Sequence, residues 1–152
     1  MEIEIRRALP EEAEALTQIA IAAKSHWSYP ERWMQIWKPE LTYHPEYVEK
    51  SDIWVAVIGG TPIGLYMLRT KDDNAWLEDL WVSPAQMGNG IGRALLSHAI
   101  QSSKERGYQI MRFESDPNAV GFYIKMGAHQ IGERHSEVEG QPRLLPIMEL
   151  KL

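Results

Sequence analysis

The sequence predicts one mixed α/β domain spanning residues 1–152, and three observations lead to this fold class. The length suits a single domain with a full core. Runs with strand periodicity alternate with runs of helical periodicity, in the order strand, helices, three-strand antiparallel meander, helix, strand, helix, strand, strand. Glycine and proline mark the boundaries between these runs, and no composition shift or low-complexity stretch suggests a linker.

The first third of the chain is predicted to hold one strand and three helices. Alternating charged and apolar residues indicate the strand, and Pro10 with the two acids after it suits a first helical turn. Ser28 and Glu31 have the spacing of a capping box, and Thr42 is expected to cap the helix that follows it. The predicted elements are strand Glu2–Arg7, a helix from Pro10 whose apolar face reaches Ala23, and short helices Tyr29–Lys38 and Thr42–Lys50.

The remaining elements follow from turn and cap signals. Gly59-Gly60 predicts a hairpin turn, and Gly64 predicts a bulge or a close backbone approach. Asp116 is expected to cap a helix, and the polar segment Ser136–Arg143 is expected to be a loop. The predicted strands are Ile53–Ile58, Pro62–Arg69, Ala75–Val82, Gln109–Glu114, Ala128–Glu133 and Leu144–Leu150, with helices from Ile91 to Gly107 and from Pro117 to Gly127.

The stretch from Leu80 to Leu96 carries the first functional signal. Leu80–Val82 is strand-forming, Ser83-Pro84 ends the strand, and Gly88, Gly90 and Gly92 precede a helical pattern. Glycines let backbone N–H groups approach a ligand, and a helix N-terminus adds partial positive charge. The pattern therefore predicts an anion site that takes phosphate groups, although a tight turn that merely needs positive φ would use similar residues.

The glycine spacing restricts which phosphate ligand is expected. Gly92 is followed by Arg93 and Ala94, which excludes the Gly-Lys-Ser/Thr ending of a P-loop. A dinucleotide fingerprint needs its third glycine one residue later, although Glu114 lies where a ribose-binding acid would stand. Nucleotide binding through Glu114 stays as a minor alternative.

Composition and charge exclude several classes of function. The net charge of −5 argues against a nucleic-acid surface, and no apolar run is long enough to span a membrane. The absence of cysteine excludes disulfides, thiolate metal sites and a cysteine nucleophile, and no histidine pair has metal-ligand spacing. The charged N-terminus does not resemble a signal peptide. We therefore expect a cytoplasmic protein without a metal.

Two segments together resemble the GNAT superfamily of acetyl-CoA-dependent N-acetyltransferases. The first is Leu80-Trp81-Val82-x-Pro84 followed by Gly88-Asn89-Gly90-Ile91-Gly92-Arg93-Ala94-Leu95-Leu96. The second, Asp116–Ala128, resembles the later family motif Ala-x-x-Phe-Tyr-x-Lys-x-Gly. The resemblance implies a twisted, mostly antiparallel sheet of about seven strands with helices on both faces, splayed between the fourth and fifth strands.

The resemblance also implies where acetyl-CoA binds. The pantetheine arm pairs with backbone groups near Leu80 and Val82, and the pyrophosphate lies on the amides up to Arg93. The family usually has Gln or Arg where this chain has Met87, so backbone donors must serve alone there. The implied cofactor-binding residues are Leu80, Trp81, Val82, Met87, Gly88, Asn89, Gly90, Ile91, Gly92, Arg93, Asn118, Phe122 and Lys125.

Acetyl transfer to an amine needs a base for the ammonium ion and an acid for the departing thiolate. Tyr123 matches the family tyrosine that acts as the acid, with a core tyrosine as the alternative. Glu78 shares a strand face with Leu80 and is the candidate base, with a water-mediated route or a purely solvated acid as alternatives. A non-catalytic module that binds acyl-CoA is the alternative; the retained Tyr123 weighs against it, and the unsettled base leaves it open.

The acceptor is expected to be a small-molecule primary amine or an amino-acid-like compound. Trp27, Tyr29 and Trp33 are the candidate substrate wall, and their aromatic faces would suit a cation. Trp33 and Trp37 have the helical spacing of core residues, which is the alternative interpretation. A homodimer is compatible with the resemblance.

Overall fold

The computed structural model describes residues 2–152, and these residues divide into two compact units that are described separately. Unit 1 comprises residues 2–68 and Asp79–His98, and unit 2 comprises Arg69–Glu78 and Ala99–Leu152. Strands β3 (Thr61–Lys71) and β4 (Asn74–Val82) and helix α4 (Ile91–Glu105) each contribute residues to both units.

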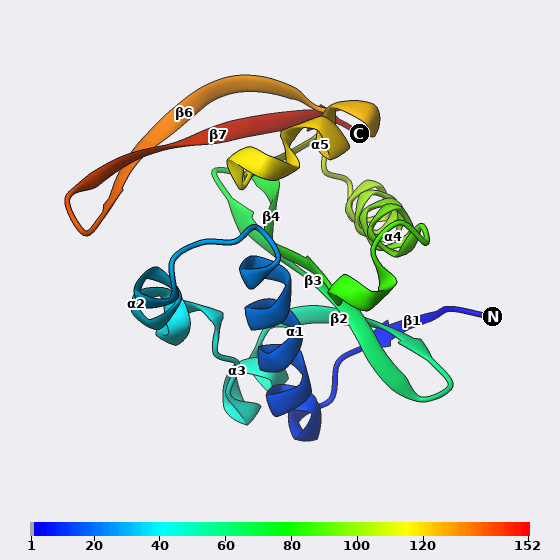
Figure 1. Cartoon of the computed structure of the whole chain (residues 1–152). Coiled ribbons are helices and arrows are strands. Elements are labelled where there is room, and N and C mark those ends of the chain that lie inside the picture. The colour runs from blue at the N-terminus through cyan, green and yellow to red at the C-terminus, as the bar shows by residue number, and fades with distance from the viewer. Residues whose placement is uncertain (1) are drawn as a thin grey trace. The chain divides into compact units, whose positions relative to one another are not determined.

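Within residues 2–152, seven strands form one sheet in the order β1-β2-β3-β4-β5-β7-β6. The β1–β2, β2–β3, β5–β7 and β6–β7 pairs are antiparallel, whereas β4 and β5 are parallel. The predicted mixed α/β class is confirmed (Figure 1). The remaining elements are β1 (Glu4–Arg7), α1 (Ala13–Ser25), α2 (Glu31–Leu41), α3 (Pro45–Lys50), β2 (Asp52–Ile58), β5 (Ile110–Glu114), α5 (Val120–Lys125), β6 (His129–Val138) and β7 (Gln141–Lys151).

The parallel pair β4–β5 is splayed. Its ladder consists of Ala75 opposite Met111 and Trp76 opposite Arg112, near the start of each strand. β5 meanwhile pairs with β7 along its whole length, from Ile110 to Glu114. The last residues of β4 are therefore not held in a ladder with β5, as the family resemblance predicts.

In unit 1, helices pack on both faces of β3, because its side chains alternate between the faces. Leu65 and Met67 belong to the buried core cluster that includes Leu16 of α1. Tyr66 points to the other face, where its hydroxyl lies 2.6 Å from Nδ1 of His98 on α4. This arrangement fixes the strand between α1 and α4.

Two predicted helix starts are wrong, for one reason. The residue before a proline avoids helical backbone angles, so α2 begins after Pro30 and α3 begins at Pro45 itself. Ser28 makes no capping box, because it lies at φ +59° in the turn after α1. Thr42 does not cap α3 either, since its hydroxyl donates to the Lys38 carbonyl at 2.7 Å.

In unit 2, β6 and β7 form a long hairpin that replaces the predicted loop Ser136–Arg143, shown in orange and red in Figure 1. Ser136 pairs directly with Arg143, and Glu139 (φ +50°) with Gly140 (φ +75°) makes the two-residue turn. Most side chains of β6 are exposed, so the strand lacks the alternation that identifies a half-buried strand.

Candidate functional site

The connection between β4 and α4 has the open geometry that its glycines predict. β4 ends at Val82, a 3-10 turn spans Pro84–Gln86, and α4 begins at Ile91. Gly88 (φ +84°) and Gly90 (φ +80°) lie in the left-handed region that favours glycine. A Cβ at either position would meet no atom within 4 Å. The loop therefore exposes bare backbone.

The first turn of α4 supplies backbone donors beside this loop. The Ala94 N–H donates to the Gly90 carbonyl at 3.0 Å, which is the first bond of the helical ladder. The amides of Ile91, Gly92 and Arg93 precede that bond and have no helical carbonyl to accept from them. Together with the helix dipole and the exposed Arg93 side chain, they can bind a phosphate group.

Gly64 fixes the end of β4 against β3 and α4 within unit 1. A Cβ on Gly64 would lie 2.9 Å from Leu95 Cδ1 and 3.0 Å from the Trp81 carbonyl oxygen. The ladder between β2 and β3 also shifts register here, because Ala56 pairs with Gly64 but the next residue pairs with Pro62. The predicted bulge and the predicted close approach are both present.

The side chains at the end of β4 divide between two faces. Trp81 packs against the core cluster of unit 1, and Asp79 accepts a hydrogen bond of 2.7 Å from the buried Tyr43 hydroxyl. Burial raises the pKa of Tyr43 well above its usual range, and the Asp79 carboxylate adds to this rise. Leu80 and Val82, both half-buried, point to the opposite face by strand alternation.

Unit 2 holds the predicted residues Glu78, Asn118, Phe122, Tyr123 and Lys125. Tyr123 is buried on α5, with its ring centroid 4.4 Å from that of Phe113 and 5.1 Å from that of Phe122. As predicted, Asp116 acts as an N-cap. It caps the 3-10 turn Pro117–Ala119 that leads into α5, because its side chain accepts from the Asn118 N–H at 2.9 Å. Glu78 is exposed on β4, with Oε2 3.7 Å from Nη1 of Arg69.

Tyr29, Trp33 and Trp37 pack together with Lys24 at the junction of α1 and α2, in what we call the Lys24–aromatic cluster. The ring centroids are 6.1 Å apart for Tyr29–Trp33, 5.0 Å for Tyr29–Trp37 and 5.9 Å for Trp33–Trp37. Lys24 Nζ lies 4.6 Å from the Trp37 ring centroid and 5.0 Å from that of Tyr29. Trp27, in the turn after α1, is exposed and does not join these contacts.

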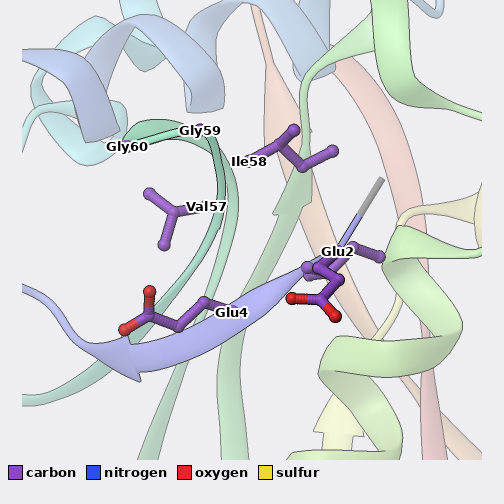
Figure 2. Close-up of a pocket in the computed structure, with 7 residues that line it drawn as sticks. Glu2, Glu4, Val57, Ile58, Gly59 and Gly60 are labelled. Carbon is purple, nitrogen blue, oxygen red and sulfur yellow. The ribbon is translucent and has the colours of Figure 1, made fainter.

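A shallow pocket of about 730 Å³ lies elsewhere in unit 1. Figure 2 shows Glu2 and Glu4 beside Val57, Ile58 and the turn Gly59–Gly60, which line it. None of the predicted site residues lines this pocket. Two carboxylates at its wall disfavour a phosphate ligand, so the glycine loop stays the candidate anion site.

The sequence reasoning missed three residues with evident contacts near the predicted site. No motif in the sequence gives a role to Lys24 or to Asp79. Tyr43, which donates a hydrogen bond to Asp79, belongs to no motif either. Strand alternation could have paired Asp79 with Trp81, but the contact with Tyr43 joins positions 36 residues apart and has no local signal.

Two possible features are absent from residues 2–152. No helix there is long and apolar enough to cross a membrane. No group of three or more His, Cys, Asp or Glu side chains in that range is placed to hold a metal ion.

The splayed sheet, with a glycine loop that opens a helix after β4, is the arrangement that the resemblance to acetyl-CoA-dependent N-acetyltransferases predicts. Residues 14–128 match the model of the Acetyltransferase (GNAT) family, and the chain belongs to this family. It is therefore an N-acetyltransferase by class, with acetyl-CoA as the family's acetyl donor, which confirms the predicted family and enzyme class.

Similar proteins agree with this assignment along the whole chain. The peptidyl-lysine N-acetyltransferase YjaB of Salmonella typhimurium is 32% identical, over 99% of this chain and 98% of its own length. YjaB of Escherichia coli is 30% identical, over 99% of this chain and 97% of its own length. The crystal structure of the PaiA N-acetyltransferase from Thermoplasma acidophilum, in complex with coenzyme A, is 27% identical with a TM-score of 0.78 and full coverage of both chains.

Proposed function

We propose that this protein transfers an acetyl group from acetyl-CoA to the primary amine of a small-molecule or amino-acid-like acceptor. The main observation behind the proposal is the loop from Gly88 to Arg93, which joins open glycines to the free first amides of α4. A phosphate-bearing cofactor fits this loop, because a Cβ at Gly88 or Gly90 would point into open space and the donors are backbone groups. YjaB acts on peptidyl-lysine, whose side chain is also a primary amine.

The cofactor-binding roles follow from the family motif. Backbone groups of Leu80 and Val82 bind the pantetheine arm as an added strand would, and an N–H near Leu80 stabilises the thioester oxygen as charge develops on it. The amides from Gly88 to Arg93 hold the pyrophosphate, apart from that of Asn89, which donates to the Gln86 carbonyl at 3.3 Å. Met87 offers no donor, because its side chain is non-polar and its N–H donates to the Pro84 carbonyl at 3.2 Å.

The chemistry needs two proton transfers, and we assign one chain residue to each. Acetyl-CoA supplies an activated thioester, the new C–N bond forms as the C–S bond breaks, and the sulfur leaves as a thiolate. Glu78, directly or through water, takes the proton that frees the attacking amine. Tyr123 gives its hydroxyl proton to the sulfur, in keeping with its place in the Phe-Tyr-x-Lys-x-Gly motif.

The first experiment tests cofactor binding and turnover separately. Thermal shift with acetyl-CoA, CoA and NAD should show stabilisation by the first two, and an amine panel with thiol detection should then show CoA release. No stabilisation by saturating acetyl-CoA would overturn the proposal. Stabilisation without thiol release for any amine would favour the non-catalytic acyl-CoA-binding alternative. Stabilisation by NAD alone would favour the nucleotide-binding alternative.

Tyr123→Phe tests the assigned acid. It should lower kcat by about ten- to a thousandfold and leave acetyl-CoA affinity nearly unchanged, because the proton donor is lost while the ring is kept. Tyr108→Phe is the matched control in the same unit, since the Tyr108 hydroxyl contacts Thr70 and has no assigned role. An unchanged kcat for Tyr123→Phe would remove this residue from the mechanism. Glu78→Gln, assayed across pH, tests whether the Glu78 carboxylate is the group that deprotonates the amine.

A further inference from the structure

The buried hydroxyl of Tyr43 connects two residues near the end of β4. Tyr43 lies between α2 and α3 and is 6% exposed. Its hydroxyl donates to Asp79 Oδ2 at 2.7 Å and forms a second hydrogen bond with the Trp81 side chain. Because an indole N–H can only donate, the Tyr43 oxygen accepts this second bond. One hydroxyl therefore holds the residues on either side of Leu80, and we call this arrangement the Tyr43 clamp.

Tyr43 is itself anchored to α1 within unit 1. Its backbone N–H donates to Thr17 Oγ1 at 2.8 Å, and the buried Thr17 hydroxyl donates to the Ala13 carbonyl at 2.9 Å. Burial, with the Asp79 carboxylate adding to it, raises the pKa of Tyr43 well above its usual range. The hydroxyl therefore keeps its proton at neutral pH and stays a donor to Asp79.

The end of β4 is fastened to β3 along one edge. The N–H of Ser83, just after β4, donates to the Ile63 carbonyl of β3 at 2.8 Å. The Trp81 carbonyl oxygen faces β3 as well, since it lies 3.0 Å from the position of a Cβ on Gly64. The backbone groups of Trp81 and Ser83 therefore point to the β3 edge.

The backbone groups of Leu80 and Val82 point to the other edge, because successive residues of a strand alternate between its two edges. Among residues 2–152, the ladder between β4 and β5 ends at Trp76, so pairing with β5 does not orient these groups. Their direction depends on how the neighbouring residues are held. The Tyr43 clamp holds both neighbours of Leu80 by their side chains.

We infer that Tyr43 is a positioning residue, which aims the Leu80 N–H at the thioester oxygen by holding Asp79 and Trp81. This inference rests on the proposed function, in which an N–H near Leu80 stabilises the charge that develops on that oxygen. Such a donor acts only when it points at the oxygen, and a misplacement of about 1 Å can cost about a hundredfold in rate. Tyr43 thus acts on the reaction through the backbone of β4.

Tyr43→Phe removes the hydroxyl and keeps the buried ring. It should lower kcat by about ten- to a hundredfold, and acetyl-CoA affinity should fall less than kcat does because the loop from Gly88 to Arg93 is untouched. Tyr66→Phe is the matched control, since Tyr66 is also buried in unit 1 but its hydroxyl lies 2.6 Å from His98 on the other face of β3. A kcat no lower for Tyr43→Phe than for Tyr66→Phe would overturn the inference. An affinity that falls as much as kcat would also overturn it, because Tyr43 would then support cofactor binding as a whole.

The carbonyl carbon of acetyl-CoA reports the hydrogen bond directly. Acetyl-CoA labelled with ¹³C at this carbon and bound without an acceptor should show a resonance downfield of free acetyl-CoA, because a hydrogen bond draws electron density toward the oxygen. Tyr43→Phe should move the bound resonance toward the free value, and Tyr66→Phe should leave it in place. A loss of stability alone does not move this resonance. A wild-type resonance at the free value, or one that Tyr43→Phe leaves unchanged, would overturn the inference.

Variants of Asp79 test whether the clamp acts through its hydrogen bond. Asp79→Asn keeps an oxygen that can accept from Tyr43 and should keep most of kcat, whereas Asp79→Ala should lose about as much as Tyr43→Phe. The two losses should not add in the double variant, because both changes break one contact. Additive losses would overturn the inference. So would an Asp79→Asn enzyme as slow as Asp79→Ala, since the charge of Asp79 would then matter and not its bond.

The proposed function and this inference can fail separately. Acetyl-CoA that gives no thermal shift would overturn the proposed function and the inference with it. A wild-type enzyme that binds acetyl-CoA and acetylates amines, with Tyr43→Phe equally active, would overturn the inference alone. A thermal melt of each variant checks folding, and Asp79→Ala takes the kinetic and resonance measurements if Tyr43→Phe does not fold.

Discussion

Replacing Gly64 by alanine tests how tightly β3, β4 and α4 are packed in unit 1. The new Cβ would stand 2.9 Å from Leu95 Cδ1 and 3.0 Å from the Trp81 carbonyl oxygen, closer than ordinary van der Waals contact. Leu95 is fully buried, so its side chain has no free space to move into, and the Trp81 oxygen is backbone. Overpacking of this kind costs about 1–3 kcal/mol of unfolding free energy.

The expected change can be measured directly. For a chain of this size, that loss lowers Tm by about 2–12 °C, and urea denaturation should show a lower midpoint with an unchanged m-value. Gly132→Ala is the control, because Gly132 is also a strand glycine but a Cβ there meets nothing within 4 Å. If the two variants are equally stable, the close packing at Gly64 is wrong. A shift of Trp81 should also weaken acetyl-CoA binding, since the proposed pantetheine contacts flank it.

Two further predictions test the glycine loop and an ion pair near the N-terminus. Gly90→Asp and Gly60→Asp place the same residue at φ +80° and +81°, so each should lose about 1–2 kcal/mol of stability, but only Gly90→Asp should weaken acetyl-CoA binding measured by calorimetry. Equal loss of affinity would place the pyrophosphate elsewhere. Glu12 accepts from Arg6 at 2.8 and 2.9 Å, and this bond lowers the pKa of Glu12. Glu12→Gln should therefore lose about 1–2 kcal/mol at pH 7, and the difference from wild type should vanish as pH falls below about 4.3 through the lowered pKa. A difference that persists in acid would contradict this role.

The parts of the fold that the sequence predicted well are those with local chemical signals. Glycines at turns and helix ends show this, because positive φ favours glycine over residues that carry a Cβ. Gly59 and Gly60 make the hairpin turn, Gly88 and Gly90 open the loop, and Gly107 follows α4 at φ +88°. The cap at Asp116 was predictable for the same reason, since a capping carboxylate and the amide it accepts from are two residues apart.

The errors have equally specific physical causes. The predicted Ser28 cap did not form because Pro30 keeps the residue before it, Tyr29, away from helical backbone angles. This restriction is stronger than the preference of a capping side chain for an earlier helix start. The β6–β7 hairpin was hidden because both faces of β6 are largely exposed, which removes the alternating pattern. The Lys24–aromatic cluster depends on how α1 turns into α2, and residue spacing alone does not determine that turn.

The positions of two neighbouring acids on β4 explain why the base is assigned to one of them and not to the other. Glu78 and Asp79 are neighbours in sequence, yet strand alternation gives them opposite faces and different surroundings. Asp79 is held by the Tyr43 hydroxyl on the face of the core cluster. Glu78 is exposed and shares its face with Leu80, the residue near which the thioester is proposed to lie. Of these two acids, Glu78 lies on the face where the amine is proposed to attack, and this is why the proposal assigns the base to Glu78, directly or through water, although Asp79 is the more firmly held carboxylate.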